Sequence, residues 1–229
     1  MPDKISVIIP AFNEEASIGR VISDIPAKLA AEVVVVDNGS TDATAETARK
    51  AGATVVRESR RGYGSACLKG MEYIENSDGK PDIVVFLDGD YSDYPEEITG
   101  LVKPVIEQGY EMVIGSRLLG MGKKRTMPFH QYMGNRLLTL LIRALYRFRF
   151  TDLGPFRAIR YDKLKQLEMR DRDYGWTAEM QVKAVKEGLS ITEVPVSYRP
   201  RIGKSKISGT VKGSMLALYK ILVVIFKNV

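Results

Sequence analysis

Cysteine is almost missing from this sequence of 229 residues, which holds a single thiol, Cys67, and therefore no internal disulfide. A lone cysteine suits a reducing compartment, and we expect Cys67 to be a small, buried apolar residue. Histidine also occurs only once. His130 stands in a polar segment, where a solvated side chain is expected.

Long hydrophobic runs are missing as well. No segment reaches the roughly 20 apolar residues that a membrane-spanning helix needs. The apolar run at residues 5–9 has the length of a strand and not of a signal peptide. We therefore expect a cytoplasmic protein, bound peripherally to the inner face of a membrane. The length and the 45% of hydrophobic residues fit one α/β domain with its own core.

Charge is unevenly distributed along the chain. Residues 1–116 hold 11 basic and 20 acidic side chains, a net charge of −9. Residues 117–229 hold 23 basic and 8 acidic side chains, a net charge of +15. This division predicts that the second half faces phosphate groups, a membrane surface or nucleic acid, although a solvated basic face has the same composition.

The first half alternates apolar strand patterns with helical patterns. Strands are predicted at residues 5–9, 33–36, 54–57, 83–87 and 112–114, and helices at residues 14–29, 41–51, 64–75 and 95–107. Such alternation indicates an α/β fold with a mostly parallel sheet covered by helices. The less regular second half predicts helices at 132–150, 176–187 and 211–227, an extended segment at 152–159 and a strand at 191–198.

Polar residues follow four of these strands, at 10–14, 37–42, 88–90 and 115–117. On a parallel sheet they share the edge at which ligands bind, although each set alone can be turn or cap chemistry. The sharpest pattern is Asp88-Gly89-Asp90, directly after a continuous apolar strand. Two carboxylates one residue apart at a strand end can face one cation, and their oxygens suit Mg²⁺ or Mn²⁺.

The segments at residues 7–14, 35–42 and 86–90 together resemble those of family-2 glycosyltransferases with the GT-A fold. This fold is a Rossmann-like nucleotide-sugar-binding domain with a mixed sheet. Later segments at 115–117, 152–157 and 201–206 resemble the branch of dolichyl-phosphate mannose and glucose synthases. The resemblance covers the chain from residue 5 to about residue 210. It implies an inverting, metal-dependent transfer of a sugar from a UDP- or GDP-sugar donor to a polyprenyl phosphate.

The resemblance also implies roles for individual residues. Donor binding is implied for Pro10, Ala11, Asn13, Glu14, Asp37, Asp42, Asp88 and Gly89. Asp88 and Asp90 are the implied ligands of a Mg²⁺ or Mn²⁺ cofactor, with Ser92 where the branch often has a third contact. The implied ligands of the acceptor phosphate are Arg117, Arg201 and Lys206, and the implied catalytic residues are Asp90, Arg117, Glu179 and Arg201.

Glu179 distinguishes two kinds of acceptor. In family members with hydroxyl acceptors, a carboxylate near this position acts as the base. A phosphate monoester is mostly dianionic at neutral pH and can attack without a base, so that Glu179 would only position the substrate. A helix-surface glutamate is a further interpretation. The only tryptophan, Trp176, is compatible with stacking on a sugar or with packing in the core.

Two predicted helices have a basic amphipathic pattern. The first carries Arg136, Arg143 and Arg147 on one stripe, and the second carries Lys212, Lys220 and Lys227 on one face. Such helices can lie in an anionic membrane interface, and core helices or a homo-oligomer interface show the same pattern. We predict a glycosyltransferase domain at residues 1–210 and a membrane-associated helix at residues 211–229. Nucleic acid is not an expected partner.

Other functional classes fit less well. Sugar-1-phosphate nucleotidyltransferases tend to have a glycine-rich loop after the first strand, and residues 10–14 contain no glycine. A dinucleotide-binding motif would follow the first strand, whereas the Gly-x-Gly at residues 62–64 follows the third. We interpret residues 60–64 as a loop that opens a helix near the donor. A non-catalytic binding module would not need the acidic pair at residues 88 and 90.

Overall fold

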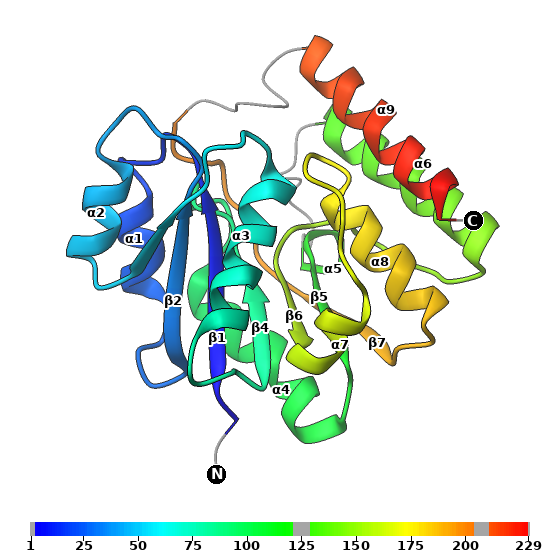
Figure 1. The fold of residues 1–229 in the computed structure, drawn as a ribbon. Coiled ribbons are helices and arrows are strands. Elements are labelled where there is room, and N and C mark those ends of the chain that lie inside the picture. Colours follow the sequence, from blue (N-terminus) through cyan, green and yellow to red (C-terminus); the bar gives the residue numbers. More distant parts are fainter. Residues whose placement is uncertain (1–2, 121–128, 204–210, 229) are drawn as a thin grey trace.

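The computed structural model of the protein describes residues 3–120, 129–203 and 211–228 (Figure 1). Its strands are β1 (Ile5–Ala11), β2 (Ala30–Asp37), β3 (Thr54–Arg57), β4 (Ile83–Phe86), β5 (Met112–Ser116), β6 (Arg157–Arg160) and β7 (Ile191–Pro195). Its helices are α1 (Ile18–Asp24), α2 (Thr44–Lys50), α3 (Tyr63–Asn76), α4 (Ile98–Gln108), α5 (Arg117–Gly120), α6 (Phe129–Tyr146), α7 (Tyr161–Gln166), α8 (Trp176–Lys186) and α9 (Val211–Lys227), with a 3₁₀ turn, η1, at Pro95–Glu97.

The strands of the described ranges form one sheet in the order β3-β2-β1-β4-β6-β5-β7. β6 is antiparallel to both of its neighbours, β4 and β5. The other neighbouring pairs are parallel. This mostly parallel, mixed sheet confirms the predicted fold class.

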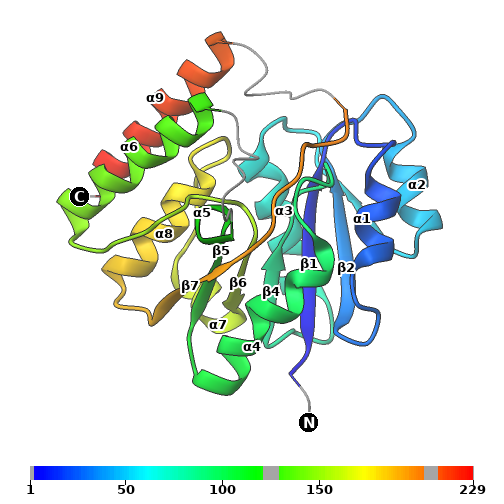
Figure 2. The same ribbon diagram turned by 180° about the vertical axis from the view of Figure 1, so that it is seen from behind.

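Helices cover both faces of the sheet (Figures 1 and 2). Val7 and Ile9 of β1 pack on the layer that contains α1, α2 and α4, whereas Ile8 packs on the layer that contains α3, α6 and α8. None of the three side chains is exposed. Because both faces are buried, residues 7–9 are apolar without interruption instead of alternating with polar residues, and the polar Ser6 of β1 is buried as well.

The reversed direction of β6 brings a further segment to the carboxyl edge of the sheet. Arg157, the first residue of β6, pairs with Phe86 at the end of β4 and with Ile114 of β5. Residues 151–156 therefore arrive at the same edge as the residues that follow β4 and β5. The sequence predicted an extended segment here but not its direction.

Several helix boundaries differ from the prediction, most clearly those of α1 and α6. α1 begins at Ile18 instead of residue 14, because residues 15–17 form a turn, and it ends at Asp24 instead of residue 29. α6 ends at Tyr146 instead of residue 150, because Arg147 has a φ of 57°. A positive φ is incompatible with continuing a right-handed helix. The short helices α5 and α7 were not predicted.

α9 lies beside α6 at one end of the molecule and spans the predicted residues (Figures 1 and 2). Its Ile225 is buried, and the hydroxyl of Tyr146 donates to the carbonyl oxygen of Ile225 at 2.5 Å. Within the described ranges, no helix combines the length and the hydropathy needed to cross a bilayer. The sequence also predicts loops at residues 119–129 and 199–210, and these segments lie largely outside the described ranges.

The chain just before α8 packs tightly against the start of α3. The amide of Gly64 donates to the carbonyl oxygen of Asp173 at 3.1 Å, and the amide of Ser65 donates to that of Arg172 at 2.9 Å. A Cβ atom at Gly64 would lie 2.1 Å from the carbonyl oxygen of Asp171. Only glycine allows this approach, so the contact fixes the loop over the first turn of α3.

Gly64→Ala should therefore destabilise the protein by about 1–3 kcal/mol, because the backbone of the facing loop must move. Gly100→Ala is the matched control. Gly100 lies in α4 with open space where its Cβ would be, and alanine there should stabilise by up to about 1 kcal/mol. Denaturant unfolding measures both free energies. Unchanged stability of the Gly64 variant would contradict the close packing.

Candidate active site

A cavity of about 450 Å³ lies at the carboxyl edge of the sheet. Its lining brings together seven of the predicted residues, namely Pro10, Ala11, Glu14, Asp88, Gly89, Asp90 and Arg201. The other lining residues are Phe12, Asn38, Arg61, Gly62, Tyr63, Ala66, Asp173 and Tyr174. The ends of β1 and β4, the start of α3 and the loop before α8 thus surround one space.

Asp88 and Asp90 lie together just after β4. The hydroxyl of Tyr63 donates to Asp88 Oδ1 at 3.1 Å, and the amide of Ser92 donates to Asp90 Oδ1 at 2.9 Å. Burial and, after it, the negative charge of Asp90 raise the pKa of Asp88 to about 7. The pair therefore resists carrying two negative charges unless a cation is added.

A third carboxyl group, Asp93, adds to this acidic end of the sheet. It is 2% exposed, and neither of its carboxylate oxygens has a hydrogen-bond partner among the described residues. Burial, followed by the charge of Asp88, raises the pKa of Asp93 well above its usual range. A site role for Asp93 could not be predicted from the sequence, since an aspartate before a 3₁₀ turn has no distinguishing pattern.

Arg201 lies across the acidic segments that follow β1 and β4. Its Nη2 is 3.0 Å from Glu14 Oε1, and its Nη1 is 3.3 Å from Asp90 Oδ2. Its Nε is buried and has no partner within the described part of the chain. A cation from the far end of the sequence therefore balances carboxylates inside the cavity.

The predicted donor residues Asn13, Asp37 and Asp42 lie close to the cavity but are not among its lining residues. Asn13 Oδ1 accepts from the amide of Thr41 at 2.8 Å, and Asp37 Oδ1 accepts from the amide of Ser40 at 2.9 Å. Asp42 accepts from the amide at the start of α2 at 3.0 Å. In this structure Asn13 and Asp42 join the loops after β1 and β2, whereas Asp37 stabilises the loop after β2 from within.

Phe12 and Asn38 line the cavity although the sequence indicated no role for them, and so does Arg61 of the predicted loop at residues 60–64. The guanidinium of Arg61 lies 3.1 Å from the centroid of the Phe12 ring, and Arg61 Nη1 donates to the carbonyl oxygen of Asn38 at 3.1 Å. Arg61, one of the two basic residues of the loop at 60–64, therefore faces the same cavity as Asp88 and Asp90. From the sequence, Phe12 and Asn38 could be identified as site residues only because they are adjacent to predicted ones.

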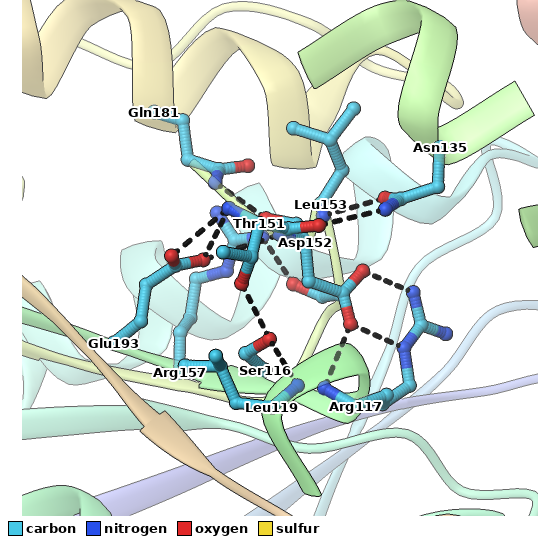
Figure 3. Close-up of polar contacts among 11 residues, drawn as sticks. Ser116, Arg117, Leu119, Asn135, Thr151, Asp152, Leu153, Arg157, Gln181 and Glu193 are labelled. Atoms are coloured by element: carbon cyan, nitrogen blue, oxygen red, sulfur yellow. Dashed lines mark hydrogen bonds and ion pairs between the residues drawn. The ribbon is translucent and has the colours of Figure 1, made fainter. Parts of the chain in front are cut away.

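Arg117 is not a lining residue of this cavity and is instead held by a carboxylate that is fully buried (Figure 3). Asp152 Oδ2 accepts from the amide and from Nε of Arg117 at 2.9 and 2.8 Å, and Asp152 Oδ1 accepts from Nη2 at 2.7 Å. Burial alone would lower the pKa of Arg117, but the charge of Asp152 outweighs it and raises that pKa. The guanidinium therefore stays charged.

Glu179 also lies outside the cavity lining. Its carboxylate accepts from the amide of Arg170 at 3.0 and 3.1 Å and from the amide of Asp171 at 2.7 Å, and it pairs with Lys183 at 2.8 Å. Glu179 thus holds the loop before α8. Trp176 is in the core, 1% exposed and edge-on to Phe86. The predicted phosphate ligand Lys206 lies outside the described residues.

The loop before α8 also contacts the C-terminal helix. Asp173 and Tyr174 line the cavity, and Asp173 forms an ion pair with Lys220 of α9. The sequence predicted Lys220 on one basic face with Lys227, but the amine of Lys220 instead pairs with Asp173 in the wall of the cavity. Only Lys227 of the two is exposed.

The side chains around Asp88 and Asp90 fit a hard divalent cation. Within the described ranges no group of three or more His, Cys, Asp or Glu side chains is arranged to hold one ion. The acidic pair would therefore supply two oxygen ligands, and phosphate oxygens and water would complete the shell. The ion pair between Asp90 and Arg201 and the raised pKa of Asp88 both indicate a position that favours positive charge.

A similar fold is found among solved structures. Glucosyl-3-phosphoglycerate synthase from Mycobacterium tuberculosis matches with a TM-score of 0.80, over 99% of this chain and 80% of that chain, at 24% sequence identity. The fold is thus that of the GT-A glycosyltransferases, as the sequence predicted.

The family model described as glycosyl transferase family 2 matches residues 6–168. The chain belongs to this family and is a glycosyltransferase. A dolichyl-phosphate hexose transferase from Haloferax volcanii is 34% identical over 221 residues, which are 93% of this chain and 91% of that protein. An undecaprenyl-phosphate mannosyltransferase from Micrococcus luteus is 29% identical over 225 residues, or 92% and 90%. These relatives support the predicted branch of the family.

The acidic pair generates a prediction about stability. The pKa of Asp88 rises on folding from the ordinary value of 3.8 to about 7, so the folded state loses stability as the pH increases through this interval. In metal-free buffer, Asp88→Asn should therefore raise the Tm at about pH 8 and change it little at about pH 4. Thermal unfolding with a chelator at both pH values measures this. An equal decrease at both would contradict the assigned charge repulsion.

Proposed function

We propose that this glycosyltransferase transfers a sugar, with inversion, from a UDP- or GDP-sugar to a polyprenyl phosphate at a membrane surface. The donor would occupy the cavity beside Asp88 and Asp90. Related crystal structures of glucosyl-3-phosphoglycerate synthase contain UDP with Mn²⁺ or Mg²⁺, which supports a nucleotide donor and a divalent cofactor. Such a cation would neutralise charge on the departing diphosphate.

The proposed reaction needs cationic groups and no general base. An oxygen of the acceptor phosphate forms a bond to the anomeric carbon while the bond from that carbon to the donor diphosphate breaks, and the nucleoside diphosphate leaves. Arg201 in the cavity, Arg117 near it and Lys206 are the proposed ligands of the acceptor phosphate. Because a phosphate monoester is mostly dianionic at neutral pH, no side chain has to remove a proton.

The observation that carries the lipid acceptor is the surface of α6 and α9. Exposed apolar residues recur at helical spacing on each helix, at Phe129, Met133, Leu137 and Leu140 of α6 and at Leu216, Tyr219, Val223 and Phe226 of α9. The sequences of the two helices contain no acidic residue, and Arg136, Arg143 and Lys227 are exposed. Apolar stripes among basic residues fit the interface of an anionic bilayer.

A soluble acceptor is the second candidate. The similar solved structures include complexes with phosphoglyceric acid, which is also a phosphate-bearing acceptor but lacks a lipid. With a hydroxyl acceptor the proposed role of Glu179 would be that of the base. Its bonds to the backbone of residues 170 and 171 favour a positioning role instead.

A direct assay separates these candidates. Purified protein is incubated with Mn²⁺, a panel of UDP- and GDP-sugars, and either a short-chain polyprenyl phosphate in detergent or 3-phosphoglycerate. The proposal expects a glycolipid product with at least one donor. Product from 3-phosphoglycerate alone would overturn the lipid acceptor and leave the family assignment intact.

Glu179→Gln should keep a kcat within about tenfold of the parent with a polyprenyl phosphate acceptor, because removal of a general base would cost about 10²–10⁴ in rate. The donor KM should rise modestly, since the loop that carries Asp173 and Tyr174 loses a charged anchor. Steady-state kinetics at saturating acceptor gives both parameters. A loss of kcat in the range expected for a base would favour a hydroxyl acceptor.

Leu137→Glu and Val223→Glu should each weaken binding to vesicles of anionic phospholipid by about tenfold or more, because a buried leucine or valine contributes about 1.5–3 kcal/mol. Ile106→Glu is the matched control, because Ile106 is an exposed apolar residue of α4, a helix distant from α6 and α9 (Figure 2). Cosedimentation measures binding. If all three variants bind as the parent does, α6 and α9 do not contact lipid.

A further inference from the structure

The carboxylate that holds Arg117 is itself fixed by two other elements (Figure 3). The amide of Asp152 donates to Glu193 Oε1 of β7 at 3.2 Å, and its carbonyl oxygen accepts from Gln181 Nε2 of α8 at 2.9 Å. Asp152 and Gln181 are both fully buried. The backbone of Asp152, from which the carboxylate projects, therefore cannot shift without breaking buried hydrogen bonds, each of which is expensive to leave unmade.

The third element that fixes this segment is α6, through Asn135. Its Nδ2 donates to the carbonyl oxygen of Thr151 at 2.9 Å, and its Oδ1 accepts from the amide of Leu153 at 2.9 Å. These bonds lie on either side of Asp152 and use both ends of the Asn135 amide, much as a neighbouring strand would. Asn135 is 8% exposed, so the clamp is shielded from solvent.

α6 has a second face with a different environment. Met133, Leu137 and Leu140 are exposed apolar residues, part of the stripe proposed to meet lipid. The same helix thus carries a lipid-facing stripe and the amide that brackets Asp152. A helix that rests on a bilayer would hold residues 151–153 at a defined height above it.

We infer that Asn135 and Asp152 are positioning residues that place the guanidinium of Arg117 for the acceptor phosphate. The inference rests on the proposed function, in which Arg117 binds that phosphate. Asp152 engages Nε and Nη2 of Arg117, and the remaining terminal nitrogen points away from Asp152 (Figure 3). One edge of the guanidinium is thereby fixed, and the other is not engaged by Asp152. A displacement of about 1 Å at such a site can cost about 100-fold in rate.

The first test compares two substitutions on one helix. Asn135→Leu removes the clamp at similar volume and should raise the KM for a short-chain polyprenyl phosphate about tenfold or more, while the donor KM and acceptor-independent donor hydrolysis stay within about twofold. Thr139→Val is the matched control. Thr139 is equally buried one turn along α6 and donates to the carbonyl oxygen of Arg136 in its own helix. Equal acceptor KM values in both variants would overturn the inference.

A double-mutant cycle separates positioning from general stability. Arg117→Ala, Asp152→Asn and the double variant are compared by kcat/KM for the acceptor. If Asp152 acts through Arg117, the double variant should be no worse than Arg117→Ala alone. Losses that simply multiply would show that the two residues act independently and would contradict the inference.

A measurement that uses no acceptor distinguishes failure of this inference from failure of the proposed function. In a nitrogen-labelled sample, the Nε–H signal of Arg117, identified by its loss in Arg117→Lys, should exchange with solvent about tenfold faster in Asn135→Leu but not in Thr139→Val, because only the first change releases the buried partner. Unchanged exchange in Asn135→Leu would overturn the inference even if the enzyme uses polyprenyl phosphate. Faster exchange in an enzyme that ignores polyprenyl phosphate would refute only the proposed acceptor.

Discussion

Negative charge accumulates where β1 and β4 end, and the rest of the cavity is arranged to balance it. Glu14, Asp88, Asp90 and Asp93 converge in a poorly solvated space in which like charges repel strongly. Arg201, from the opposite end of the sequence, supplies the compensating charge. A diphosphate brings further negative charge, so its entry requires cations. Arg201 is thus the point at which the basic second half of the chain meets the acidic first half inside the cavity.

The two outer helices are connected to the site at different points. α9 reaches the cavity wall through Lys220 and Asp173, and α6 reaches Arg117 through Asn135 and Asp152. Both connections are made by polar side chains on helices whose outer faces are apolar. Under the proposed function, substrate recognition and attachment to a membrane would therefore depend on the same pair of helices.

The first half could be predicted from the sequence because its signals are local. Strands buried on both faces are continuous apolar runs, and Asp88 and Asp90 directly follow one of them. The structure of the second half could not be predicted in the same way, because it depends on contacts between residues that are distant in the sequence. The inward turn of Lys220 is set by a loop 47 residues away, and the role of Asp152 is set by partners on three other elements. Neither side chain differs in sequence pattern from an ordinary surface lysine or a turn aspartate.

The reversed strand β6 has a consequence for how this enzyme family can diversify. The chain leaves the sheet after β5 and returns at Arg157 on the adjacent strand, so the two ends of this excursion lie only about 5 Å apart. Because the excursion leaves and rejoins the sheet on neighbouring strands, changes within it need not break the pairing of β5 with β6. Residues 117–156 are nevertheless joined to the rest of the fold, since Asp152 binds Glu193 of β7 and Gln181 of α8. Replacement of this excursion would therefore require matching changes on β7 and α8.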